Sequence, residues 1–118
     1  LEYLHQKYPL TIISNGFTEV QYKKLKSSNI EHYFKHIVLS ESAGALKPDK
    51  QIFEYALMLN NAMAIESVMI GDSYEADIKG AQNAGIDQIY FPLQPVTGSS
   101  KPACTYLINS LREIKTIL

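Results

Sequence analysis

The feature that most constrains the fold is the alternation of short apolar runs with stretches of helical periodicity. Short, continuously apolar runs rich in β-branched residues are typical of strands buried on both faces of a sheet. The predicted strands cover residues 10–14, 36–40, 67–71, 86–92 and a shorter run at 106–108. Because these strands alternate with helices, we predict an α/β fold, Rossmann-like and doubly wound with a mainly parallel sheet. No repeat or second domain is evident, so the prediction is one domain over residues 1–118.

Capping and breaking residues delimit the helices between these strands. Leu1, Leu4 and Tyr8 have helical spacing in the first segment, although no capping residue precedes them. The other helices are predicted to run from Thr18, in a capping box with Gln21, to about Ser28; from Pro48, at the first helical position, to Asn60; from after Asp72 to Gly85; and from the cap Ser110 to Leu118. An apolar stripe on the helix after Pro48 consists of Ile52, Phe53, Ala56 and Leu57. A loop rich in Pro, Gly and Ser is expected at 92–102.

Composition excludes several classes of function. The chain has 118 residues, 46% of them hydrophobic, and a formal charge of -1. This near-neutral charge, without clustered Lys or Arg, argues against nucleic acid as a partner. Cys104 is the one cysteine, so neither an internal disulfide nor a thiolate metal cage is expected. We find no long apolar run or signal peptide, and therefore expect a cytoplasmic protein with no membrane partner.

Two aspartates follow an apolar run in the segment IGDSYEADIKGAQNAG, residues 70–85. Asp72 comes directly after the third predicted strand, and Ser14 ends the first. Ligands of open parallel sheets bind beyond the carboxyl ends of the strands, near helix N-termini. Asp72 therefore has two interpretations: it belongs to a ligand-binding edge, or it forms a capping box with Glu75 at the start of the next helix.

Asp77 is harder to explain as a surface residue. On a helix it shares a face with Gly80, Ala81 and Ala84, and small residues on one face indicate a backbone pressed close to the sheet. A buried carboxylate without a cation or donors costs several kcal/mol or changes its protonation. Mg²⁺ commonly takes one or two protein carboxylates, with water and substrate phosphate as its other ligands. Asp72 and Asp77 together therefore suggest a Mg²⁺ site.

A lysine and a polar turn complete the predicted site. Lys47, in the segment GALKPDKQIF, precedes a predicted helix, where a cation is disfavoured by some tenths of a kcal/mol unless an anion offsets it. A single lysine of this kind is more often a solvated surface side chain. Ser14, Asn15 and Gly16 form a plausible phosphate cradle, although a Ser-Asn-Gly turn is more often simply a turn. We expect Lys47 to hold a phosphoryl group or an aspartate at the same sheet edge as Asp72 and Asp77.

Three segments, in this order and at these distances, carry a resemblance to a known family. TIISNG, LKPDKQIFEYAL and VMIGDSYEADIKGAQNAG resemble the second, third and fourth motifs of the haloacid dehalogenase-like hydrolase superfamily. The resemblance spans nearly the whole chain, and its longest motif is the most specific. It is closest to the branch with a helical cap, which contains phosphoglycolate phosphatases, phosphoglucomutases and pyrimidine nucleotidases; of these we favour the nucleotidases.

The resemblance implies a role for each candidate residue. Ser14 would bind the transferring phosphoryl group with the help of Asn15 and Gly16, and Lys47 would stabilise the charge on nucleophile and phosphate. Asp72 would ligate Mg²⁺, and Asp77 would support the metal site or orient Lys47. The implied activity is phosphomonoester hydrolysis through a phosphoaspartate, and the implied substrate is a small phosphorylated metabolite or nucleotide.

The chain also departs from the family pattern. These enzymes use an aspartyl nucleophile, with a second aspartate two residues later, on their first strand. The four aspartates here, Asp49, Asp72, Asp77 and Asp87, include no such pair. The family's cap, which falls between its first and second motifs, is also missing. We therefore expect the C-terminal part of a longer hydrolase, inactive alone, in which the missing central strand leaves unpaired edges that a homodimer or strand exchange could fill.

Two alternatives from other classes stay open at this point. A noncatalytic binding or assembly module would explain the missing nucleophile, although it would have no need of an inward Asp77. A signalling receiver domain has similar length and acidic residues. Its Lys-Pro pair resembles Lys47-Pro48 but follows the acidic residues in the chain, whereas here the pair precedes them.

Overall fold

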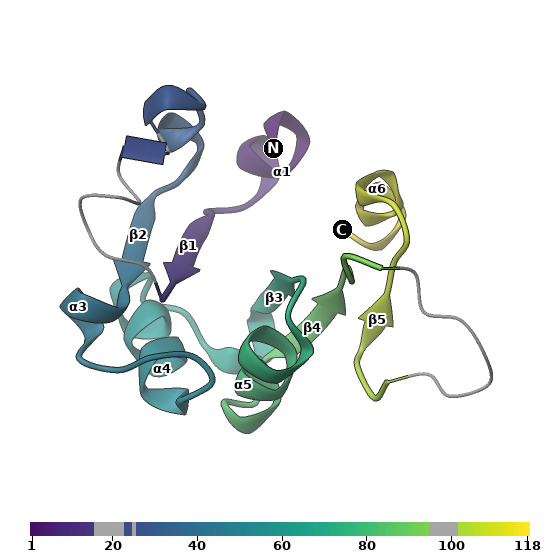
Figure 1. The fold of residues 1–118 in the computed structure, drawn as a ribbon. Helices are drawn as coiled ribbons and strands as arrows, with labels where there is room; N and C mark the ends of the chain where they lie inside the picture. Colours follow the sequence, from purple (N-terminus) through teal and green to yellow (C-terminus); the bar gives the residue numbers. More distant parts are fainter. Residues whose placement is uncertain (16–22, 25, 95–101) are drawn as a thin grey trace. The chain divides into compact units, whose positions relative to one another are not determined.

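A computed structural model of the chain describes residues 1–15, 23–24, 26–94 and 102–118. The structure divides into two compact units, Leu1–Ala62 and Met63–Leu118 (Figure 1). All strand pairs in both units are parallel, which confirms the predicted α/β class. Within the described part of the chain, no helix has the length and apolarity needed to cross a membrane.

The first unit is a two-stranded parallel sheet with helices. Its elements are α1 (Glu2–Lys7), β1 (Thr11–Ser14), η1 (Glu31–Tyr33), β2 (His36–Leu39), α3 (Ser40–Ala43) and α4 (Lys50–Leu59). Thr11 lies opposite His36 and Ser14 opposite Leu39, so the two strands end at the same level. The helix α4 packs against both strands. This arrangement brings Asn15, directly after β1, and the loop before α4 to the carboxyl ends of the strands.

The core of the first unit confirms the predicted apolar stripe except at Leu57, which is half-buried. Ile52 and Phe53 are fully buried, Ala56 is 7% exposed, and they face a core that includes Val38 and Leu39 of β2. The expectation of complete burial was wrong for β1, all of whose residues are half-buried. Among the described residues, the sheet of this unit has two strands, and β1 pairs with β2 on one flank.

Two details at the carboxyl end of β2 differ from the prediction. The predicted loop after β2 begins with one helical turn, α3, which ends at Gly44 in the left-handed conformation (φ 70°). Pro48 was predicted at the first helical position of the next helix, but α4 begins at Lys50. Asp49 is its N-cap and accepts a hydrogen bond from Gln51 N at 3.0 Å. The helix begins after Asp49 because the aspartate carboxylate accepts a hydrogen bond from a helical N–H that has no partner within the helix, whereas a proline side chain has no acceptor for such a bond. The predicted capping box of Thr18 and Gln21 lies outside the described residues.

The second unit contains the acidic motif. Its elements are η2 (Ala64–Glu66), β3 (Val68–Gly71), the π-helical turn η3 (Tyr74–Ile78), α5 (Lys79–Asn83), β4 (Asp87–Tyr90), β5 (Tyr106–Leu107), η4 (Leu111–Glu113) and α6 (Ile114–Ile117). The strand order is β3-β4-β5, and Val68 lies opposite Asp87 and Gly71 opposite Tyr90. The turn η3 packs against β3 and β4, and α5 packs against β4 (Figure 1).

Most predicted ends of the second unit are confirmed. Gly85 follows α5 with φ 75°, a conformation that favours glycine, and so ends the helix as expected. Ser110 caps the last helical segment in a capping box with Glu113, although its first turn, η4, is a 3-10 helix. The loop predicted at 92–102 lies largely outside the described residues. The core consists of Ile78, Ala81, Ile86, Ile89, Ile108 and Ile114.

Candidate functional site

The acidic turn, η3 with the aspartates Asp72 and Asp77, has its first helical residue at Tyr74. If Asp72 were the cap, the turn would begin at Ser73. Ser73 is the N-cap of η3, and its hydroxyl oxygen accepts a hydrogen bond from Ala76 N at 3.2 Å. The capping box of Asp72 with Glu75 is therefore wrong. Asp72 is exposed directly after the carboxyl end of β3. Its carboxylate is not used as the cap, and its role as a metal ligand stays a prediction.

Asp77 lies on the packed face, as predicted. It is 4% exposed, and Gly80 and Ala81, three and four residues further on, are buried with it. Its Oδ2 accepts a hydrogen bond from Ser73 N at 3.1 Å. Two hydrogen bonds thus stabilise the turn: the Ser73 hydroxyl accepts from a helical N–H, and the Asp77 carboxylate accepts from the Ser73 backbone N–H. One backbone donor offsets part of the cost of burying the carboxylate.

Gly71 makes room for this carboxylate, a role that the sequence reading missed. A Cβ added at Gly71 would overlap the Cβ, Cγ and Oδ2 atoms of the Asp77 side chain. The last residue of β3 must therefore be glycine for Asp77 to sit beside the strand. A glycine at the end of an apolar strand and directly before Asp72 was the available signal.

The donor set of this turn fits a hard divalent cation. Asp72 and Asp77 supply carboxylate oxygens at the carboxyl end of β3, and Mg²⁺ commonly uses one or two such ligands together with water and phosphate. Among the described residues, no group of three or more His, Cys, Asp or Glu side chains is placed to hold a metal ion. The residues therefore fit Mg²⁺ bound with substrate better than a metal held entirely by the protein.

In the first unit, Asn15 holds the backbone of Lys47. Asn15 Oδ1 accepts a hydrogen bond from Lys47 N at 2.8 Å, and Asn15 Nδ2 donates to Lys47 O at 3.2 Å. The two residues are 32 positions apart in the chain. The paired contacts fix the half-buried Lys47, which precedes a cis peptide bond to Pro48, beside the carboxyl end of β1.

The other candidate residues of the first unit surround this contact. Ser14 is the last residue of β1, and Ser40 Oγ donates to Asn15 O at 3.4 Å. Gly16 lies outside the described residues. Lys47 belongs to the first unit, whereas Asp72 and Asp77 belong to the second. Their convergence on one phosphate stays a prediction.

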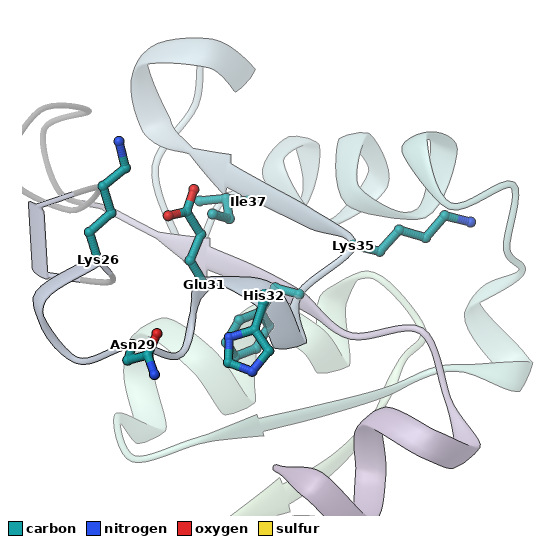
Figure 2. Close-up of a pocket in the computed structure, with 7 residues that line it drawn as sticks. Lys26, Asn29, Glu31, His32, Lys35 and Ile37 are labelled. Carbon is teal, nitrogen blue, oxygen red and sulfur yellow. The ribbon is translucent and has the colours of Figure 1, made fainter.

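A hollow of the first unit lies at the other end of β2. It has a volume of about 590 Å³ and is lined by Lys26, Asn29, Glu31, His32, Phe34, Lys35 and Ile37. Figure 2 shows the Lys35 side chain pointing away from the other labelled residues, so the two lysines do not converge on one ligand. The hollow is at the amino end of β2, while Asn15 and Lys47 meet at the carboxyl end. It is separate from the candidate site.

A parallel α/β fold with carboxylates and a lysine after its strands is typical of proteins that bind phosphate with a metal ion. A family model described as haloacid dehalogenase-like hydrolase matches residues 1–91. The chain belongs to this family of hydrolases. The match favours the hydrolase lineage over the receiver alternative.

Three relatives illustrate the similarity. YfnB of Bacillus subtilis (strain 168), named as a HAD hydrolase, is 37% identical over 98% of this chain and 49% of its own length. Its crystal structure, bound to magnesium, has a TM-score of 0.85 at 35% identity over 98% of this chain and 50% of that one. The pyrimidine 5'-nucleotidase YjjG of Escherichia coli (strain K12) is 35% identical over 91% of this chain and 48% of its own length.

The third relative is the glyceraldehyde 3-phosphate phosphatase of Methanothermobacter thermautotrophicus. It is 43% identical over 70% of this chain and 36% of its own length. The chain thus spans half or less of the length of these curated relatives.

Proposed function

We propose that the full-length protein is a Mg²⁺-dependent phosphomonoester hydrolase that acts on a small phosphorylated metabolite or nucleotide. The observation that carries this proposal is the buried Asp77 carboxylate, which is fitted against Gly71 and bonded to Ser73 N at the end of β3. Carboxylate oxygens at the ligand-binding end of a parallel strand are suited to hold a divalent cation together with water and phosphate. Two of the relatives are named as phosphatases or nucleotidases, which supports the substrate class.

Each unit contributes one part of the proposed chemistry. In the second unit, Asp72 and Asp77 would hold Mg²⁺, which when bound neutralises charge on the phosphoryl oxygens. In the first unit, Ser14 and Gly16 would bind the phosphoryl group, and the Lys47 ammonium would stabilise its negative charge. The Asn15 side chain gives both of its polar groups to the Lys47 backbone, so it contributes to phosphate binding by holding Lys47 in place.

The nucleophile belongs to a part of the protein outside this chain. None of the four aspartates in the chain forms the Asp-x-Asp pair of the family. We propose that this pair is supplied by a strand encoded upstream, and that the 118-residue chain alone does not hydrolyse phosphate esters. The first aspartate of the pair would take the phosphoryl group while the substrate alcohol leaves with a proton from the second aspartate, and water would then hydrolyse the phosphoaspartate to the free aspartate and inorganic phosphate.

The proposal is tested on the full-length protein with a matched pair of variants. Phosphate release from pyrimidine 5'-monophosphates, glyceraldehyde 3-phosphate and p-nitrophenyl phosphate is measured across a Mg²⁺ titration. Asp72→Asn should raise the Mg²⁺ concentration for half-maximal activity by at least about tenfold. Asp87→Asn is the control, because the same change is made at the exposed amino end of β4. Equal Mg²⁺ dependence of the two variants would refute the metal assignment.

The same assay distinguishes the proposed hydrolase from the noncatalytic binding module. Lys47→Ala should lower kcat strongly with little effect on the unfolding midpoint. Lys50→Ala is the control and should change neither quantity, because Lys50 is exposed and its Nζ makes only a surface ion pair, 3.9 Å from Glu54 Oε1. A full-length protein that binds Mg²⁺ through Asp72 but releases phosphate from none of these esters would favour a noncatalytic module.

A further inference from the structure

One backbone carbonyl receives two hydrogen bonds from the helical segment that follows the acidic residues. Tyr74 Oη donates to Ala103 O at 2.9 Å, and Gln82 Nε2 donates to the same oxygen at 2.8 Å. Tyr74 opens the π-helical turn η3, between Asp72 and Asp77, whereas Gln82 lies in α5 beyond both aspartates. The acidic turn is therefore tied to a segment about thirty residues further along the chain.

The segment that carries this carbonyl is itself anchored on β4. Gln88 N donates to Thr105 Oγ1 at 3.0 Å, and Thr105 N donates to Gln88 Oε1 at 3.3 Å. The Gln88 side chain is 7% exposed, and its Nε2 donates to Ile86 O at 2.6 Å. A buried amide with these partners fixes Thr105 to the strand. The carbonyl of Ala103, two residues before Thr105, is consequently an acceptor close to a point where the chain is bonded to β4.

The turn that Tyr74 opens is an unusual one. Ser73 O accepts a hydrogen bond of the α-helical spacing from Asp77 N at 2.9 Å and one of the wider, π-helical spacing from Ile78 N at 3.3 Å. Single π-helical turns are rare and are frequently found at functional sites. Their hydrogen bonding is less regular than that of an α-helix, so contacts outside the turn contribute to holding its shape. The Tyr74 ring lies 5.6 Å from the Tyr90 ring of β4, which sets the direction of the hydroxyl.

We propose that Tyr74 is a positioning residue for the metal site. Its hydroxyl, held on Ala103 O, keeps η3 in the π-helical form that places the Asp77 carboxylate against Gly71 and on Ser73 N. This inference rests on the proposed function, because the carboxylates are taken as Mg²⁺ ligands. It adds a residue that contacts neither metal nor substrate and acts on them through the shape of the turn.

The chain offers a matched control for this role. Tyr74→Phe removes the hydroxyl and keeps the ring beside Tyr90, and Gln82→Met removes the second donor to the same carbonyl. Gln82→Met also loses a 3.4 Å contact with Gln88 Oε1, so it perturbs the segment at least as much. A merely structural contribution predicts similar effects from the two variants. Positioning of the acidic turn predicts that Tyr74→Phe alone affects Mg²⁺ binding.

Two measurements on the full-length protein test the proposal. Measured by calorimetry, Tyr74→Phe should raise the Mg²⁺ dissociation constant about tenfold, which is the lower end of the effect of losing a residue that orients a metal ligand. Gln82→Met should raise this constant less than about twofold. In metal-free protein, amide exchange of Ser73, whose N–H is bonded by Asp77, should accelerate in Tyr74→Phe alone. Equal changes in the two variants in both measurements would overturn the positioning role.

The outcomes distinguish this inference from the proposed function. If wild-type protein binds Mg²⁺ and Asp72→Asn weakens that binding, the metal assignment is supported. The comparison of Tyr74→Phe with Gln82→Met then tests only the positioning role of Tyr74. If Asp72→Asn leaves Mg²⁺ binding unchanged, the metal assignment is overturned and the positioning role with it.

Discussion

Gly71→Ala is the substitution whose effect follows most directly from the structure. The added Cβ would overlap three atoms of the buried Asp77 side chain. Gly71 is not among the glycines with positive φ, so alanine is compatible with the backbone at this position. The cost of the substitution therefore comes from the overlap with Asp77 and not from backbone strain.

The magnitude depends on how the overlap is relieved. If Asp77 stays in place, overpacking of this kind costs about 1–3 kcal/mol. Rotation of the Asp77 side chain would clear Cγ and Oδ2 but leave Cβ in place, so the other route is a shift of η3 away from β3 that gives up the hydrogen bond from Ser73 N at 3.1 Å. A hydrogen bond to a charged group contributes about 1.5–3 kcal/mol. The cheaper route sets the result, so we expect a loss of about 2 kcal/mol, roughly a thirtyfold change in the unfolding equilibrium.

A double-mutant cycle with Asp77→Gly isolates this cause. In the Asp77→Gly background the overlapping atoms are absent, and replacing glycine by alanine at a compatible position is stabilising by about 0.4–1 kcal/mol. The effect of Gly71→Ala on stability should therefore change sign between the two backgrounds. Urea unfolding of the four full-length proteins, followed by circular dichroism, measures the cycle. A similar loss in both backgrounds would refute the explanation through Asp77.

Two further predictions concern other contacts. Asn15→Ala should cost about 1 kcal/mol and lower kcat, because both hydrogen bonds to the Lys47 backbone are lost. Asn15→Asp should cost less, since it keeps the acceptor for Lys47 N; identical urea midpoints and kcat values for the two variants would contradict this. Burial raises the pKa of the Cys104 thiol, so its alkylation by iodoacetamide should reach half-maximal rate at a higher pH in folded than in urea-unfolded protein. A lower midpoint in the folded protein, measured on the Cys104 peptide, would contradict the burial argument.

Local patterns were sufficient for the strands and for the inward direction of Asp77. Apolar runs predicted β1 to β5 to within a few residues, and helical spacing placed Asp77 on the same face as Gly80 and Ala81. Gly85 ended its helix as expected because a left-handed residue is a local requirement. These features depend on residues within about one turn or one strand of each other, so a single sequence contains the information.

Tertiary structure decided the contacts that turn these elements into a site. The sequence pattern indicated Asp72 as a candidate helix cap, whereas in the structure Ser73 is the cap and its backbone N–H is bonded by the Asp77 carboxylate. The pairing of Asn15 with Lys47 and of Tyr74 with Ala103 joins residues 32 and 29 positions apart. Such contacts arise when packing of strands and helices brings distant backbone groups within hydrogen-bonding distance, and no periodicity in the chain records that proximity.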